Sequence, residues 1–67
     1  MTNFFEANQV RLSLKMKLSF YAWYSSSTVV SGDDGYSVVI GVKEINNKVR
    51  KLIPPVVNGI GVKTEVE

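Results

Sequence analysis

The 67-residue chain contains no cysteine and no histidine. Disulfides are therefore excluded, and zinc, haem and iron–sulfur sites are not expected because they rely on cysteine or histidine ligands. Catalytic arrangements that use histidine as the base or cysteine as the nucleophile are excluded for the same reason. We expect no cofactor and no enzymatic activity.

Long hydrophobic runs are also missing. No apolar stretch approaches the ~20 residues that a transmembrane helix needs. Residues 1–7 show no basic segment followed by an apolar core, which is the pattern of a secretory signal. Together with the absence of cysteine, which is typical of reducing compartments, these features predict a cytoplasmic protein without a membrane partner.

The chain is short for a folded domain, although its hydrophobic content of 45% is that of a globular protein. A domain of this size buries a limited core, and many such domains depend on disulfides, metals or partner subunits. Because the first two supports are absent, we expect one domain that relies on self-association or on another protein. Accessory, assembly and inhibitor proteins, including phage-encoded ones, are commonly this small.

The segment 9–20 fits two kinds of secondary structure. Asn3 and Glu6 resemble a helix capping box, and apolar residues recur from Val10 at i, i+4 and i+8, as on one face of a helix. Apolar residues also alternate with polar ones from Val10 to Phe20, which is typical of a half-buried strand. The abundance of strong helix formers and the scarcity of β-branched residues favour the helix.

The middle of the chain predicts a β-hairpin. Ser26–Val30 and Tyr36–Lys43 are rich in β-branched residues, and residues 31–35 supply the turn formers of a loop between them. Asp33 and Asp34 are adjacent in this loop. We interpret them as a solvated turn, with weak Mg²⁺ or Ca²⁺ binding as the alternative.

The last third predicts a second helix and a final strand. Residues 45–53 fit a short helix that ends before Pro54-Pro55, or else a hairpin that turns at Asn46-Asn47; helical spacing favours the helix. Asn58-Gly59 predicts a turn, and residues 60–66 alternate as a strand.

These elements predict an α+β domain spanning residues 1–67. The expected order is helix, strand, strand, helix, strand, with the helices covering one face of a three-stranded sheet. An all-β meander or small barrel is the alternative fold. At least one edge of such a sheet stays open and is a site for pairing with another chain.

Three short motifs carry a resemblance to a known family. They are Val38–Lys43, Ile53-Pro54-Pro55 and Asn58–Lys63. In this order they resemble the small α/β module that precedes some bacterial trypsin-like peptidase domains, and the likeness covers residues 28–67. These 67 residues contain no peptidase domain, so the resemblance implies an α+β fold and a non-catalytic accessory role.

Aromatic residues crowd the segment after the first predicted helix. Phe20, Tyr21, Trp23 and Tyr24 fall within five positions. As core residues they are anchors of a small interior, which we expect first for Trp23 and Phe20. As surface residues they are typical of protein interfaces, and we expect Tyr21 and Tyr24 to be exposed. Tyr21, Trp23 and Tyr24 are therefore candidate partner-binding residues.

Basic residues form two local clusters, one on each predicted helix. Their members are Arg11, Lys15, Lys48, Arg50 and Lys51. Phosphate contacts from such a set give salt-sensitive nucleic-acid binding, whereas a solvated helix face is the other interpretation. A net charge of +2 is low for a dedicated nucleic-acid binder. The sequence favours a non-enzymatic protein-interaction domain, probed below, with nucleic-acid binding as the alternative.

Overall fold

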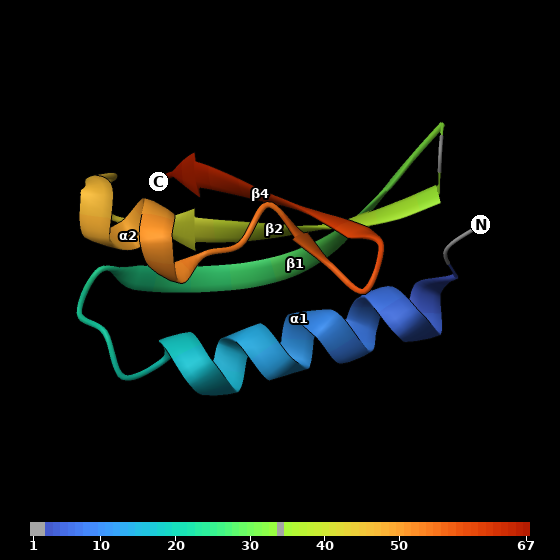
Figure 1. The fold of residues 1–67 in the computed structure, drawn as a ribbon, viewed down its shortest axis with the longest axis horizontal. Coiled ribbons are helices and arrows are strands. Elements are labelled where there is room, and N and C mark those ends of the chain that lie inside the picture. Colours follow the sequence, from blue (N-terminus) through green and yellow to red (C-terminus); the bar gives the residue numbers. More distant parts are fainter. Residues whose placement is uncertain (1–2, 34) are drawn as a thin grey trace.

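The computed structural model describes residues 3–33 and 35–67, which form two helices and a four-stranded sheet (Figure 1). The elements are α1 (Phe4–Leu18), β1 (Tyr24–Gly32), β2 (Gly35–Val42), α2 (Asn47–Leu52), β3 (Val56–Val57) and β4 (Ile60–Val66). The α+β class is confirmed. The expected three-stranded sheet is wrong, because the short strand β3 joins the sheet beside β4.

The N-terminal segment is a helix, so the alternative interpretation as a strand is wrong. The Asn3 side chain accepts a hydrogen bond from the Glu6 backbone N–H at 2.8 Å and caps the first turn of α1. At the other end the Ser19 N–H donates to the Lys15 carbonyl at 2.9 Å. Side-chain capping and strong helix formers together outweigh the period-two alternation.

The predicted hairpin is present as the antiparallel pair β1 and β2. Its register pairs Val29 with Val38 and continues to Gly32 and Gly35, so the predicted five-residue loop is too long. Asp33 is exposed in the turn, and Asp34 lies outside the described residues.

Strand β4 lies between β2 and β3 and gives the sheet order β1-β2-β4-β3. It runs parallel to β2 and antiparallel to β3. The turn between β3 and β4 places Asn58 at φ 51° and Gly59 at φ 79°, the left-handed conformation that favours this residue pair. The predicted Asn-Gly turn is therefore correct, whereas β3 is too short to show a strand pattern in the sequence.

Helix α2 occupies the segment for which a hairpin was the alternative. The Asn46 side chain accepts a hydrogen bond from the Val49 N–H at 3.0 Å and caps the helix start. Val49 is fully buried, and the Ile53 N–H closes the last turn on the Val49 carbonyl at 3.0 Å. The helix ends before the two prolines, as the sequence predicts.

The core lies on one face of the sheet. Its buried members on the helices and on β2 are Ala7, Val10, Leu14, Leu18, Val38, Ile40, Val42 and Val49. Side chains at alternate strand positions point to the same face, so both helices cover the face that carries Ile40. Val39 points to the opposite face and is not part of this cluster.

Candidate functional site

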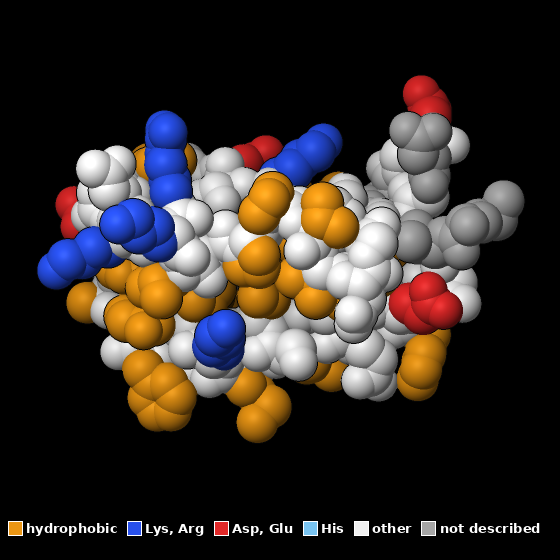
Figure 2. All heavy atoms as spheres, in the orientation of Figure 1, with side chains coloured by type: hydrophobic (Ala, Val, Ile, Leu, Met, Phe, Trp, Pro, Cys, Tyr) orange, Lys and Arg blue, Asp and Glu red, His pale blue; other side chains and the backbone are white. Residues whose placement is uncertain are grey.

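Helix α1 carries two rows of apolar side chains. One row is buried in the core, and the second row faces solvent. Phe5 is 68% exposed, Met16 74% and Phe20, just beyond the helix end, 89%, while Leu12 is less exposed at 38%. We call these four residues the outer stripe. Space-filling spheres show hydrophobic side chains projecting along the margin where α1 lies (Figure 2). Large apolar residues gathered on one exposed face mark an interaction surface more often than chance exposure.

The outer stripe explains the alternation that made this segment ambiguous. Successive helical residues are rotated by about 100°, so residues two apart point to nearly opposite sides of the helix. An apolar residue at every second position therefore builds two rows. Val10, Leu14 and Leu18 form the buried row, and Leu12 and Met16 belong to the exposed one.

The position of Phe20 corrects an expectation from the sequence, since this ring is not a core anchor. Ser19 keeps right-handed helical angles, with φ −63° and ψ −16°. Phe20 therefore continues the rotation of α1 by one more residue and falls on the side of Met16. The core is filled instead by aliphatic side chains from both helices and from β2.

A groove runs beside the outer stripe, between α1 and the β3–β4 turn. Its volume is about 430 Å³, and its walls are Phe5, Glu6, Gln9, Val10, Ser13, Val57, Asn58 and Ile60. Phe5 belongs to both features, so the groove and the outer stripe form one continuous surface. The apolar floor with a polar rim is the usual composition of a protein-binding surface.

The three aromatic candidates lie at the C-terminal end of α1, and none of them is fully buried. Tyr21 is exposed and stacks on Trp23, with ring centroids 5.0 Å apart and planes 15° from parallel. Trp23 and Tyr24 are half-buried and pack against the core, so the expectation that Tyr24 is exposed is wrong. The Tyr24 hydroxyl donates to Ser27 Oγ at 3.1 Å. Tyr21 is the exposed member of this set and follows Phe20 directly in the sequence.

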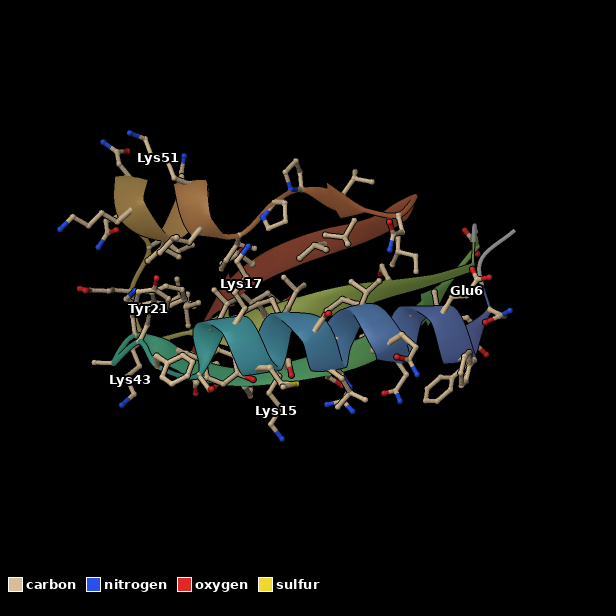
Figure 3. The ribbon with its side chains drawn as sticks, turned by 60° about the horizontal axis from the view of Figure 1, so that its bottom comes forward. Glu6, Lys15, Lys17, Tyr21, Lys43 and Lys51 are labelled. Atoms are coloured by element: carbon tan, nitrogen blue, oxygen red, sulfur yellow. The ribbon has the colours of Figure 1, made fainter. Side chains whose placement is uncertain are left out.

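The basic candidates lie on two separate elements. Lys15 is exposed, and Arg11 is half-buried with its Nε donating to Asn8 Oδ1 at 3.0 Å. Lys48, Arg50 and Lys51 are exposed on α2. Lys15 and Lys51 point to opposite sides of the molecule, whereas Lys17 lies on the side of α1 that faces α2 (Figure 3). The candidate cations of α1 and α2 therefore do not meet in one cluster.

Strand β1 forms one edge of the sheet. It pairs with β2 alone within the described part of the chain, and its nine residues include neither a charged side chain nor proline. Natural edge strands commonly carry lysine or proline that discourages pairing with other chains. The edge of β1 is thus a second exposed feature that suits contact with another polypeptide.

A hydrogen-bonded clamp ties Glu67 to the start of β1. Ser25 Oγ donates to Glu67 Oε2 at 2.5 Å, and Ser26 Oγ donates to Glu67 Oε1 at 2.6 Å. The carboxylate crosses β2 over Gly41, where an added Cβ would overlap the carboxylate and approach Ser26 Oγ to 2.6 Å. These hydrogen bonds, first from Ser25 and then from Ser26, lower the pKa of the Glu67 carboxyl below its ordinary value of 4.5.

We expect the clamp to make stability depend on acid pH. A carboxyl with a lowered folded-state pKa stabilises the fold above its unfolded pKa, and this contribution is lost as pH falls through the folded pKa. The variant Glu67→Gln should therefore match the wild type more closely at about pH 3 than at about pH 6 in urea unfolding. Gly41→Ala should displace the carboxylate and raise the Glu67 pKa in an NMR titration. An unchanged titration curve for Gly41→Ala would contradict the clamp.

The described residues show no cluster of side chains that could hold a metal ion. No group of three or more acidic side chains in residues 3–33 and 35–67 is placed to hold a metal ion. The predicted alternative of a cation at Asp33-Asp34 falls partly outside these ranges, since Asp34 is not described. No helix in the same ranges is long and apolar enough to cross a membrane.

Comparisons with protein-family models, curated proteins and solved structures found no match. The resemblance of residues 28–67 to a peptidase-preceding module stays a prediction. The outer stripe, including Phe5, Leu12 and Met16, was missed by the sequence reasoning; the alternation from Val10 to Phe20 was the signal that contained it.

Proposed function

We propose that this chain is a non-enzymatic protein-interaction domain, an accessory, assembly or inhibitor protein that binds its partner through the outer stripe of α1. The observation that carries the proposal is the pair of apolar rows on one helix. The inner row completes the core, so the outer row is not needed to close it. A helix that is apolar on two opposite sides is suited to packing between its own sheet and a second protein.

The energetics favour a partner for this surface. Complete burial of a large apolar side chain contributes about 1.5–3 kcal/mol, and Phe5, Met16 and Phe20 are largely exposed. Binding of a partner therefore gains the free energy of burying these side chains, which folding of the single chain does not gain. Tyr21, next to Phe20 in the sequence, adds an exposed ring, and aromatic rings are frequent among the residues that dominate binding energy.

The composition fits the same proposal. A domain of 67 residues without disulfides has a limited core, so association contributes to its stability as well as to its function. The absence of cysteine accords with a cytoplasmic location, where partners are met under reducing conditions.

Binding assays on matched variants test the proposal. Met16→Glu places a charge in the outer stripe, and Val56→Glu makes the same change at an exposed valine on β3, outside the outer stripe and the groove. We expect Met16→Glu to weaken self-association or capture of a protein partner by at least about tenfold, and Val56→Glu to preserve both. Binding that Met16→Glu leaves unchanged would contradict the proposal. Salt-sensitive DNA binding that is lost when Lys48, Arg50 and Lys51 are neutralised would instead support the nucleic-acid function.

A further inference from the structure

Two exposed phenylalanines, Phe5 and Phe20, lie at the ends of the outer stripe, and the point midway between them falls between Leu12 and Ser13. Under a two-fold rotation about this point, Phe5 exchanges with Phe20 and Gln9 exchanges with Met16. In a two-fold interface each residue meets its exchange partner on the other copy, so a phenylalanine of one copy meets a phenylalanine of the other at each end.

We propose that the outer stripe binds a second copy of this chain, with the two α1 helices antiparallel across a two-fold axis near Leu12 and Ser13. This inference rests on the proposed function and names the partner. Each Phe5 packs beside Phe20 of the other copy, about 22 Å from the corresponding pair at the opposite end. Ser13 is small and lies near the axis, where it allows the two helices to approach closely.

Charges on α1 select the antiparallel orientation. Glu6 lies in the first turn, and Lys15 and Lys17 lie in the last turn. Glu6 and Lys17 are eleven residues apart, or about three turns, and therefore share one flank of the helix. They sit at opposite ends of α1 on the same side, whereas Lys15 points to the other side (Figure 3). Antiparallel packing brings Glu6 of each copy within about two residues of the other copy's Lys17.

Parallel packing is disfavoured by the same residues. It places the basic last turn of one α1 beside the basic last turn of the other, and it aligns the two helix dipoles in the same direction. Antiparallel packing reverses one dipole against the other and removes the juxtaposition of the Lys17 side chains. The apolar side chains alone do not distinguish the two orientations, but the charges on α1 do.

The available area is sufficient for a weak dimer. The exposed parts of the four outer-stripe side chains amount to roughly 500 Å² in each copy, given the size of aromatic and long aliphatic side chains. Two copies together bury roughly 1,000 Å², which is the lower bound for a specific interface. The adjoining groove adds contact area along Gln9 and Ser13. We expect a dissociation constant in the roughly micromolar range.

Sedimentation velocity over a wide concentration range tests the dimer. The wild type should pass from monomer to dimer, and Met16→Glu should weaken the association by at least about tenfold. Val56→Glu is the matched control and should leave the association unchanged. Circular dichroism of all three proteins at low concentration checks that each remains folded.

A charge exchange tests the orientation. Glu6→Lys and Lys17→Glu should each weaken the dimer, because each creates a like-charge contact across the interface. The double variant should recover part of the loss, since the opposite charges meet again in exchanged positions. Two single losses that simply add would overturn the antiparallel arrangement.

The outcomes separate this inference from the proposed function. A wild type that stays monomeric at every concentration overturns the dimer; if Met16→Glu then abolishes capture of a different protein, the proposed function stands. Dimerisation that Met16→Glu does not affect overturns the assignment of the outer stripe. Binding of the monomer to anionic lipid vesicles, lost in Met16→Glu and retained in Val56→Glu, overturns both proposals and assigns the surface to a lipid partner.

Discussion

Replacing Ile40 by alanine is expected to lower the free energy of unfolding by about 3–4 kcal/mol. Ile40 is fully buried on β2, which lies between β1 and β4, and its side chain faces both helices. Removing three carbon atoms leaves a cavity that the surrounding elements close only in part. A domain of this length has a total stability of roughly 3–10 kcal/mol, so the variant should be partly or wholly unfolded at 37 °C.

Urea unfolding followed by circular dichroism measures this effect. Val30→Ala is the matched control, because Val30 lies on β1, on the sheet face opposite the core, and is exposed. We expect this control to cost less than about 1 kcal/mol. Equal costs for the two variants would contradict the placement of Ile40 at the centre of the core.

The strands and turns could be predicted where local chemistry alone determines the conformation. β2 and β4 are dense in β-branched residues, and Asn58-Gly59 adopts the left-handed angles that this pair tolerates. The capping side chains of Asn3 and Asn46 mark both helix starts, each through a hydrogen bond to a backbone N–H three residues later. These signals lie within a few residues of the structure that they specify.

The features that could not be predicted depend on contacts between distant residues. The Glu67 carboxylate accepts hydrogen bonds from Ser25 and Ser26, which are 42 and 41 positions away in the sequence. No local sequence pattern predicts that contact. A glycine inside a strand, such as Gly41, commonly marks a bulge or a close approach of another group. The bulge lies in β1 between Tyr24 and Ser26, and the group that packs closely over Gly41 is the Glu67 side chain.

The exposed apolar surface of α1 could not be predicted, because the apolar residues of this segment fit both the period of a strand and the period of a helix. Polar–apolar alternation distinguishes a strand from a helix only if each of them has a single apolar face. A helix with two apolar rows satisfies the alternation and the helical spacing together. Phe20 was expected in the core for the same reason. If a helix has only one apolar side, a large ring at its end has apolar neighbours only in the core.

Two glutamate substitutions two residues apart provide the sharpest test of this arrangement. Leu14→Glu should lower the free energy of unfolding by more than about 4 kcal/mol, because it removes a buried side chain and places a carboxylate in an apolar core. Met16→Glu should change it by less than about 0.5 kcal/mol at low protein concentration, because the site is exposed and both residues are good helix formers. Urea unfolding of the two variants measures the difference.

The expected difference in stability between the two variants depends on which side of α1 faces the core. Both variants have the same net charge, the same new side chain and nearly the same distance from the helix end, so a difference of several kcal/mol between them arises from burial alone. If Met16→Glu unfolded the chain as readily as Leu14→Glu, α1 would be buried on both sides within a single copy. The outer stripe would then be part of the core, and the proposed partner surface would not exist.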